Sequence, residues 1–173
     1  YKRQFGAVAH QWLDLLGDHG IKAWQLLPLA PTDGLGSPYS SPSGFALNPW
    51  LLDAELLQAD GLIEAADREA LPCGGNPQRL ELHLAQERAF ALGRALLQRY
   101  PGWPEEWRER FAHWRRQQHH WLDDHCRFMV LRRRHEGQPW WQWPAPFARR
   151  QRSALQALDA QEHDALLQEA LVQ

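Results

Sequence analysis

Ser37 and Tyr39 stand two residues apart in a long segment, PTDGLGSPYSSPSGFALNP at 31–49, which is rich in glycine, proline and serine. A tyrosine offers a flat apolar face that can stack on a sugar ring, together with a phenol that hydrogen-bonds to hydroxyls. Gly34 and Gly36 let the backbone approach a ligand, and the serines add further hydroxyl groups. One interpretation of these residue types is the wall of a sugar-binding cleft.

The same segment has a structural interpretation, in which Pro38, Phe45 and Trp50 only hold a long loop against the body of the protein. Composition alone leaves both interpretations open. Position favours a binding role, because ligands of α/β barrels and open sheets sit beyond the carboxyl ends of the strands. The segment begins at such an end, directly after the apolar run IKAWQLLPL at 21–29.

Nine histidines invite a metal hypothesis, and their densest cluster is HHWLDDHC at 119–126. On a helix His119 lies one turn from Asp123, and His120 one turn from Asp124, so each pair could contribute two ligands. The HExxH pattern is absent, and the polar face of an amphipathic helix would show such residues anyway. We therefore interpret the cluster as a solvated helix face and predict no metal site.

Two basic runs, RRR at 132–134 and RRQR at 149–152, could contact phosphates. Nearby acids or helix ends would neutralise them, and the chain has a net charge of −2 with histidine neutral. Solvated or helix-terminal charge is therefore favoured over nucleic acid binding. Apolar runs such as LLPLA are far shorter than the roughly 18 residues of a membrane span, so no membrane partner is expected. The oligomeric state stays open.

Familiar catalytic patterns are missing: GxSxG, the Walker pattern and the dinucleotide-binding glycine pattern do not occur. Glycoside chemistry needs two carboxylates facing each other across a sugar. We place the aspartates mostly on outward helix faces and find no facing pair among Asp14, Asp18, Asp33, Asp53, Asp123 and Asp124. The two cysteines, Cys73 and Cys126, have no CxxC spacing, which fits a reducing cytoplasm.

The elements around the loop predict an α/β unit. Gly20 suits the left-handed position after a helix, and the almost continuous apolar run at 21–29 predicts one buried parallel strand. Residues at helical spacing predict a preceding helix over 5–19 with one buried stripe: Phe5, Val8, Trp12, Leu15 and Leu16.

The remaining chain predicts helices: a short one capped by Asp53, one over 84–100, and a helix or helix pair after Pro104 that runs to 135–137. The expected inward side chains of this last element are Trp107, Phe111, Trp114, Trp121, Leu122, Cys126, Met129 and Val130. One strand cannot form a sheet by itself, so a larger fold is expected around this chain.

Three segments resemble the 4-α-glucanotransferases of the amylomaltase type, glycoside hydrolase family 77. WQLLPLAPTDGLGSPYSSPSGFALNPWLLD is similar to the family segment in which a Trp-Gln strand leads through Pro-Thr to Ser-Pro-Tyr and Asn-Pro. WLDDHCRFMVLRRRHEGQPWWQWP resembles a later segment with a Pro-Trp-x-x-Trp-Pro motif. QFGAVAHQWLDLLGDHGIKAWQ is similar to the first barrel helix, so the resemblance covers nearly all the chain, as its N-terminal portion.

The resemblance implies part of a (β/α)8 barrel with a mainly helical insertion. Residues 1–50 would start the catalytic barrel and supply the substrate loop, and residues 51–173 would form the insertion and return toward the barrel. The family moves α-1,4-glucan segments between maltodextrins by a retaining double displacement, with two Asp and one Glu as catalytic acids. No metal or organic cofactor is implied.

The resemblance places those three acids beyond Gln173, so this chain alone is expected to be inactive and to hold no catalytic residue. It implies substrate contacts by Ser37 and Tyr39, with Pro38 fixing their presentation, and a weaker contact by Asn48, which could also be only a turn former. Where family members have an aromatic residue and an acid before Ser-Pro-Tyr, this chain has Gly-Leu-Gly. That departure puts a secondary glucan site in doubt.

Two rival hypotheses stay open. A non-catalytic glucan-binding module would use the same loop without the rest of a barrel. A helical protein-interaction or RNA-binding protein would use the Trp- and Arg-rich helices, and its binding would weaken steeply with salt and ignore maltodextrin.

Overall fold

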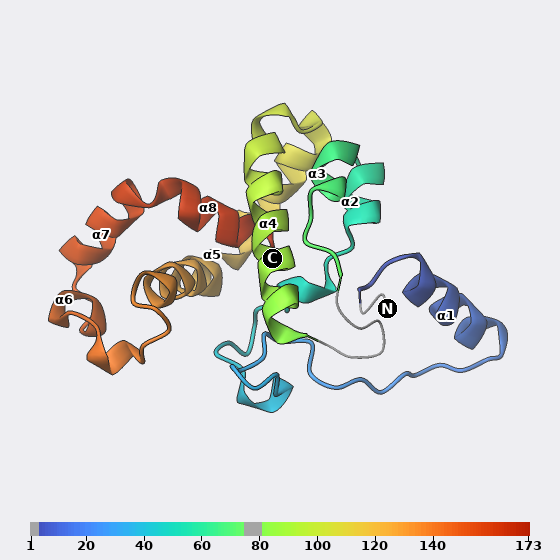
Figure 1. Cartoon of the computed structure of the whole chain (residues 1–173), viewed down its shortest axis with the longest axis horizontal. Helices are drawn as coiled ribbons and strands as arrows, with labels where there is room; N and C mark the ends of the chain where they lie inside the picture. The colour runs from blue at the N-terminus through green and yellow to red at the C-terminus, as the bar shows by residue number, and fades with distance from the viewer. Residues whose placement is uncertain (1–3, 75–80) are drawn as a thin grey trace. The chain divides into compact units, whose positions relative to one another are not determined.

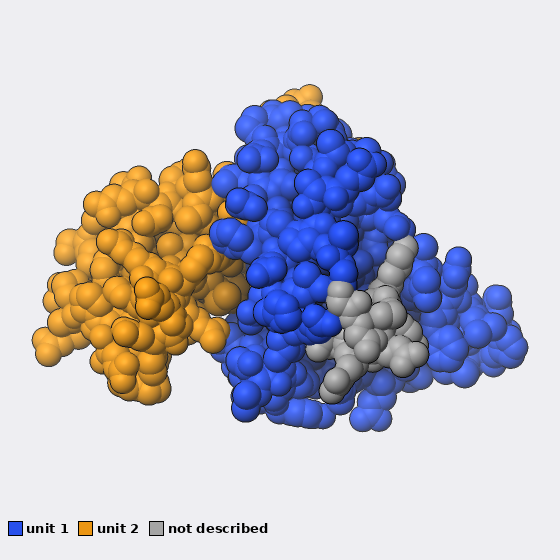
Figure 2. Space-filling model, in the orientation of Figure 1, with its two compact units in different colours: residues 1–104, 173 blue, residues 105–172 orange. Residues whose placement is uncertain are grey.

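The structure is a computed structural model that describes residues 4–74 and 81–173 (Figure 1). It forms two compact units, one made of the chain up to Pro104 together with Gln173, the other of residues 105–172 (Figure 2). The expected division after residue 50 concerns parts of a larger fold and stays a prediction. The first unit contains α1 (Ala7–Asp18), η1 (Pro38–Ser40), η2 (Pro49–Leu51), α2 (Ala54–Ala59), α3 (Ala65–Glu69), α4 (Leu82–Arg99) and η3 (Tyr100–Gly102), where η marks a 3-10 helix.

The predicted strand over 21–29 is wrong. Throughout the described residues the chain forms helices, turns and coil without any β-strand, and 21–29 is coil (Figure 1). The side chains expected to be buried, including Ile21, Trp24 and Leu27, are exposed. A strand exists only through a ladder of hydrogen bonds to a neighbouring strand, and no described segment forms such a ladder with this one. The α/β class is therefore corrected to a helical structure, and the described residues supply no strand to the barrel that the resemblance implies.

Helix α1 forms where the periodicity predicts it and ends as expected. Gly20 adopts φ +72°, and Ile21 N donates to Leu16 O at 2.9 Å, which is the hydrogen bond of a Schellman motif. The predicted buried stripe is wrong, however, because only Leu16 is buried in this helix. Val8 and Trp12 are exposed, since spacing selects an apolar face but does not supply a partner to cover it.

Helices α2 to α4 form the packed part of the first unit. Asp53 caps α2 as predicted, with its Oδ1 accepting from Glu55 N at 2.9 Å and Leu56 N at 3.1 Å. Trp103 is buried after α4 and donates from Nε1 to Leu62 O at 2.9 Å. The other large buried apolar side chains of these helices and turns are Leu62, Ile63, Leu71, Leu92 and Leu96.

An ion-pair cluster joins α3 to the end of α4. Arg99 Nε donates to Asp67 Oδ2 at 2.8 Å, and the same guanidinium contacts Glu64. The hydrogen bond from Arg99 lowers the pKa of Asp67. The cluster also holds the first turn of α3, because Asp67 Oδ2 accepts from Glu64 N at 2.9 Å.

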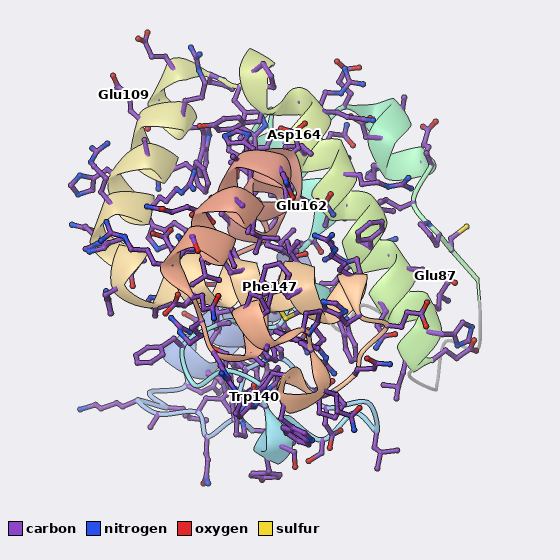
Figure 3. The ribbon with its side chains drawn as sticks, turned by 90° about the vertical axis from the view of Figure 1, so that its left-hand side faces the viewer. Glu87, Glu109, Trp140, Phe147, Glu162 and Asp164 are labelled. Carbon is purple, nitrogen blue, oxygen red and sulfur yellow. The ribbon has the colours of Figure 1, made fainter. Side chains whose placement is uncertain are left out.

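The second unit is built on α5 (Glu105–Arg134), one continuous helix of 30 residues. Helix α8 (His163–Leu171) packs along it, as Figure 1 shows, and α7 (Arg152–Gln161) contacts both helices. A turn with η4 (Trp140–Gln142) and α6 (Ala145–Ala148) connects α5 to α7. Trp140 and Phe147 mark this turn in Figure 3, and Glu162 and Asp164 mark the beginning of α8.

Two apolar clusters hold these helices together. Leu122 and Cys126 of α5 pack with Ala170 of α8, and Val130 and Leu131 pack with Trp143 and Leu158. Leu122, Cys126 and Val130 are thus confirmed as inward residues. Phe111, Trp114 and Trp121 are partly buried against the first cluster.

Acidic partners neutralise several arginines of the second unit. Arg127 makes two hydrogen bonds to Asp159, at 2.8 and 2.7 Å, and lowers the pKa of that carboxyl. From the two basic runs, Arg133 pairs with the buried Glu169 and Arg150 pairs with Asp124. These arginines are engaged in intramolecular ion pairs and so are less available to phosphates.

The histidine cluster at 119–126 divides between surface and core. His119 and His120 are exposed, as a solvated helix face requires. His125 and Cys126 are buried instead, with His125 only 7% exposed and its ring 6.0 Å from that of Trp121. Burial raises the pKa of Cys126 to about 12 and lowers the pKa of His125.

Because burial lowers the pKa of His125, we expect the second unit to lose stability as the pH falls. Below the ordinary pKa of 6.5, His125 takes up a proton in the unfolded chain, whereas in the folded helix it stays neutral down to its lowered pKa. The free energy of unfolding therefore decreases as the pH falls from 6.5 toward the pKa of the folded state. Urea unfolding followed by circular dichroism at about pH 7.5 and about pH 5.5 measures this loss. His125→Phe should reduce the pH dependence, whereas His119→Gln should not. Equal pH dependence in wild type and His125→Phe would contradict the assignment.

Candidate functional site

Ser37, Pro38 and Tyr39 form one tight turn, the 3-10 helix η1 with its cap. Pro38 stands in the first turn of this helix, and Ser37 caps it, because Ser37 Oγ accepts from Tyr39 N at 3.3 Å. The Tyr39 side chain is 75% exposed, so its ring and phenol are accessible rather than packed inside the unit. The turn therefore presents an aromatic ring and a hydroxyl close together.

Asp33 closes the loop before this turn. Its Oδ1 accepts from Leu35 N at 2.9 Å and from Ser37 N at 2.8 Å. Its own N–H donates to Ser37 O at 3.1 Å, and its carbonyl accepts from Gly36 N at 3.1 Å. Asp33 thus lies in the loop, as expected for the segment 31–49. A sequence signal for this role exists, because an aspartate in a glycine-rich loop commonly accepts hydrogen bonds from the backbone N–H groups that follow it.

The two glycines of the loop have different roles. Gly36 adopts φ +85°, which side chains rarely tolerate, and a Cβ there would lie 3.0 Å from Leu82 Cδ2. A Cβ at Gly34 would have no atom within 4 Å beyond those of its chain neighbours, so the space beside its backbone is open. The turn geometry thus requires Gly36, and the approach of a ligand to Gly34 stays a prediction.

Serine side chains organise the second half of the loop. Ser41 Oγ donates to Ser43 O at 2.7 Å, and Ser43 Oγ accepts from Phe45 N at 3.2 Å and Ala46 N at 3.1 Å. Phe45 and Leu47 are exposed beside these turns. The loop therefore combines a hydrogen-bonded backbone with accessible apolar side chains.

Asn48 lies in a different turn from Tyr39 and is only 9% exposed. Its Oδ1 caps η2 by accepting from Trp50 N at 3.1 Å, and its N–H donates to Leu29 O at 2.8 Å. This geometry supports the interpretation of Asn48 as a turn former. A contact between Asn48 and a ligand stays a prediction.

Gln173 binds the loop from a distant part of the sequence. Leu47 N donates to Gln173 Oε1 at 2.9 Å, and Gln173 Nε2 donates to Leu47 O at 3.3 Å. Both backbone polar groups of Leu47 are satisfied by one side-chain amide. Sequence reasoning missed this contact, because nothing in the local pattern around residue 47 or 173 indicates it.

The described residues contain no group of three or more histidine, cysteine, aspartate or glutamate side chains arranged to hold a metal ion. In the same part of the chain no helix is both long enough and apolar enough to cross a membrane. The candidate site is the loop of hydrogen-bonded turns in which Ser37 caps η1 and Tyr39 is exposed.

A family model described as 4-α-glucanotransferase, glycoside hydrolase family 77, matches residues 4–173. The chain belongs to this family. A 4-α-glucanotransferase from Thermus thermophilus is 37% identical over 155 residues, covering 87% of this chain and 29% of the relative. One from Synechocystis is 31% identical, covering 87% of this chain and 30% of the relative. The resemblance found in the sequence motifs is confirmed, and the chain spans about three tenths of the length of these curated relatives.

The fold also has a solved counterpart. An amylomaltase from Streptococcus agalactiae, determined in complex with acarbose, matches with a TM-score of 0.87 over 98% of this chain and 34% of that chain. The two sequences are 24% identical in this comparison, so the likeness shows a shared fold and no more.

Replacing Gln173 tests whether its side chain holds the loop. In Gln173→Ala the Leu47 N–H loses its acceptor, so we expect this amide to exchange with deuterium about tenfold faster. Amide exchange of the 173-residue chain followed by NMR measures the change. Gln161→Ala removes an exposed glutamine at the end of α7 and should leave Leu47 unaffected. Unchanged exchange at Leu47 in Gln173→Ala would show that the contact does not hold the loop.

Proposed function

We propose that this chain is the N-terminal part of a 4-α-glucanotransferase, which transfers α-1,4-glucan segments between maltodextrins. The observation that carries the proposal is the family match over residues 4–173. The relatives from Thermus and Synechocystis carry the same name, and the amylomaltase of the same fold was solved with acarbose bound. The substrates of the whole protein are therefore proposed to be maltodextrins or related α-1,4-glucans.

The proposed reaction is a retaining double displacement. A carboxylate attacks the anomeric carbon to form a glycosyl-enzyme, and a carboxylic acid protonates the leaving oxygen and then activates the acceptor hydroxyl. We assign no catalytic residue to this chain and propose that the acids belong to other parts of the polypeptide. We also propose that the enzyme is cytoplasmic and uses no metal or organic cofactor.

The proposed contribution of this chain is substrate positioning by the turn at 37–39. The exposed ring of Tyr39 can stack against a glucose unit, and its phenol can exchange hydrogen bonds with sugar hydroxyls. Ser37 Oγ accepts from Tyr39 N and keeps its own O–H as a donor for the ligand. Pro38 restricts the backbone between them. Correct placement of a sugar lowers the barrier, because the reacting groups then meet in a productive orientation.

Replacing Tyr39 in the full-length protein tests this contribution. We expect Tyr39→Ala to lower the rate of transfer between maltodextrins by about ten- to a thousand-fold through lost positioning. Disproportionation of maltotriose, measured by glucose release, reports the rate. Trp141→Ala removes another exposed aromatic ring, one outside the loop, and should leave the rate within about twofold. Unchanged kinetics in Tyr39→Ala would remove this residue from the site.

The 173-residue chain by itself provides a second test. We expect no glucose release and no disproportionation of maltotriose, because the proposed catalytic acids lie outside it. Binding of maltodextrin without turnover would fit both this proposal and a non-catalytic glucan-binding module. Activity of the full-length protein separates them, and turnover by the short chain would show that it does contain catalytic acids.

A further inference from the structure

We propose that Asp33 is a positioning residue that holds Ser37 and Tyr39 in their binding orientation before a glucan arrives. This inference rests on the proposed function, because it assigns a cause to the geometry of that site. Asp33 neither belongs to the Ser-Pro-Tyr motif nor touches Tyr39 in any hydrogen bond of the described loop. Its effect therefore passes through the backbone.

The geometry makes Asp33 the common partner of the residues before the turn. Its carboxylate oxygen Oδ1 receives two backbone N–H groups, those of Leu35 and Ser37. Its backbone exchanges two further hydrogen bonds with Gly36 and Ser37. One side-chain oxygen that accepts from two N–H groups ties both to the same point, and it fixes the position at which η1 begins.

Tyr39 depends on this anchor because little else restrains it. Its side chain is mostly exposed, so packing does not set the direction of the ring. Its backbone N–H is held by Ser37 Oγ, and Ser37 is held in turn by Asp33. The chain of contacts therefore runs from Asp33 through Ser37 to Tyr39.

The hydrogen bonds to Asp33 do not form merely because the loop is packed in a core. Leu35, one of the two residues whose N–H groups donate to the Asp33 carboxylate, is 90% exposed. An apolar side chain in water gains nothing from this position, so hydrophobic packing does not form the turn. Hydrogen bonds to Asp33 and the left-handed conformation of Gly36 are what close it.

Loss of the anchor should appear in substrate binding. If the turn at 37–39 is formed only a tenth of the time, the apparent dissociation constant for the glucan rises about tenfold. At saturating substrate the bound turn is formed again, so kcat should change much less than KM. A residue that only stabilised the fold would lower the amount of active protein and leave KM unchanged.

The test compares Asp33→Ala with Asp33→Asn in the full-length protein, with maltotriose as the substrate. Asparagine keeps a side-chain oxygen at the same place and should restore the turn, as Asn commonly does in such loops. We expect Asp33→Ala to raise KM about tenfold with kcat within about threefold, and Asp33→Asn to stay near wild type. Asp18→Ala, an exposed aspartate at the end of α1, serves as the matched control. A KM within about twofold of wild type in Asp33→Ala, or equal damage in both variants, overturns the proposal.

A second measurement separates this inference from the proposed function. Amide exchange of the 173-residue chain should show faster exchange at Leu35 and Ser37 in Asp33→Ala and near wild-type exchange in Asp33→Asn. This result needs no enzymatic activity. If the wild-type protein fails to disproportionate maltotriose, the proposed function is wrong. If exchange at Leu35 and Ser37 is unchanged in Asp33→Ala, the anchor itself is wrong.

Discussion

The backbone of the segment between α1 and α2 must satisfy its polar groups without a helix ladder or a sheet. It does so with short polar side chains: Asp33, Ser37, Ser43, Asn48 and Asp53 each accept at least one nearby backbone N–H. Each bond closes a small turn, so the segment becomes a series of fixed turns rather than a wandering chain. The rest of the candidate site depends on this constraint, because only a fixed backbone can give an exposed ring a defined direction.

The arrangement also bears on the proposed binding role of the exposed apolar side chains. Leu35, Tyr39 and Phe45 project from a loop whose backbone is already bonded. A ligand that binds such a surface does not have to order the loop, so less of its binding free energy is lost to conformational entropy. Gln173 also restrains the loop, because its side-chain amide forms two hydrogen bonds with the backbone of Leu47, a residue far away in the sequence. The loop proposed as a binding wall therefore has its backbone turns formed before any ligand binds.

Particular residues show how far local sequence rules reach. Gly20 in the left-handed region and Asp53 at a helix N-terminus are confirmed, since both depend on neighbours within a few residues. The stripe on α1 and the burial of His125 are not predicted correctly. Periodicity shows which face of a helix is apolar, but the side that meets another element depends on packing partners far away in the sequence. The bonds of Asp33 could be anticipated from loop chemistry, whereas the contact of Gln173 with Leu47 could not.

Motifs spread along the chain were enough to establish the family, and bonds between close neighbours were enough to establish the local turns and helix ends. The secondary structure of the apolar run at 21–29 was decided only by the tertiary structure, in which the run is coil with exposed apolar side chains and not a strand. The physical reason is that a strand is a relation between two segments. Composition can favour extended backbone, but only a paired neighbour supplies the hydrogen bonds and the burial that make a strand.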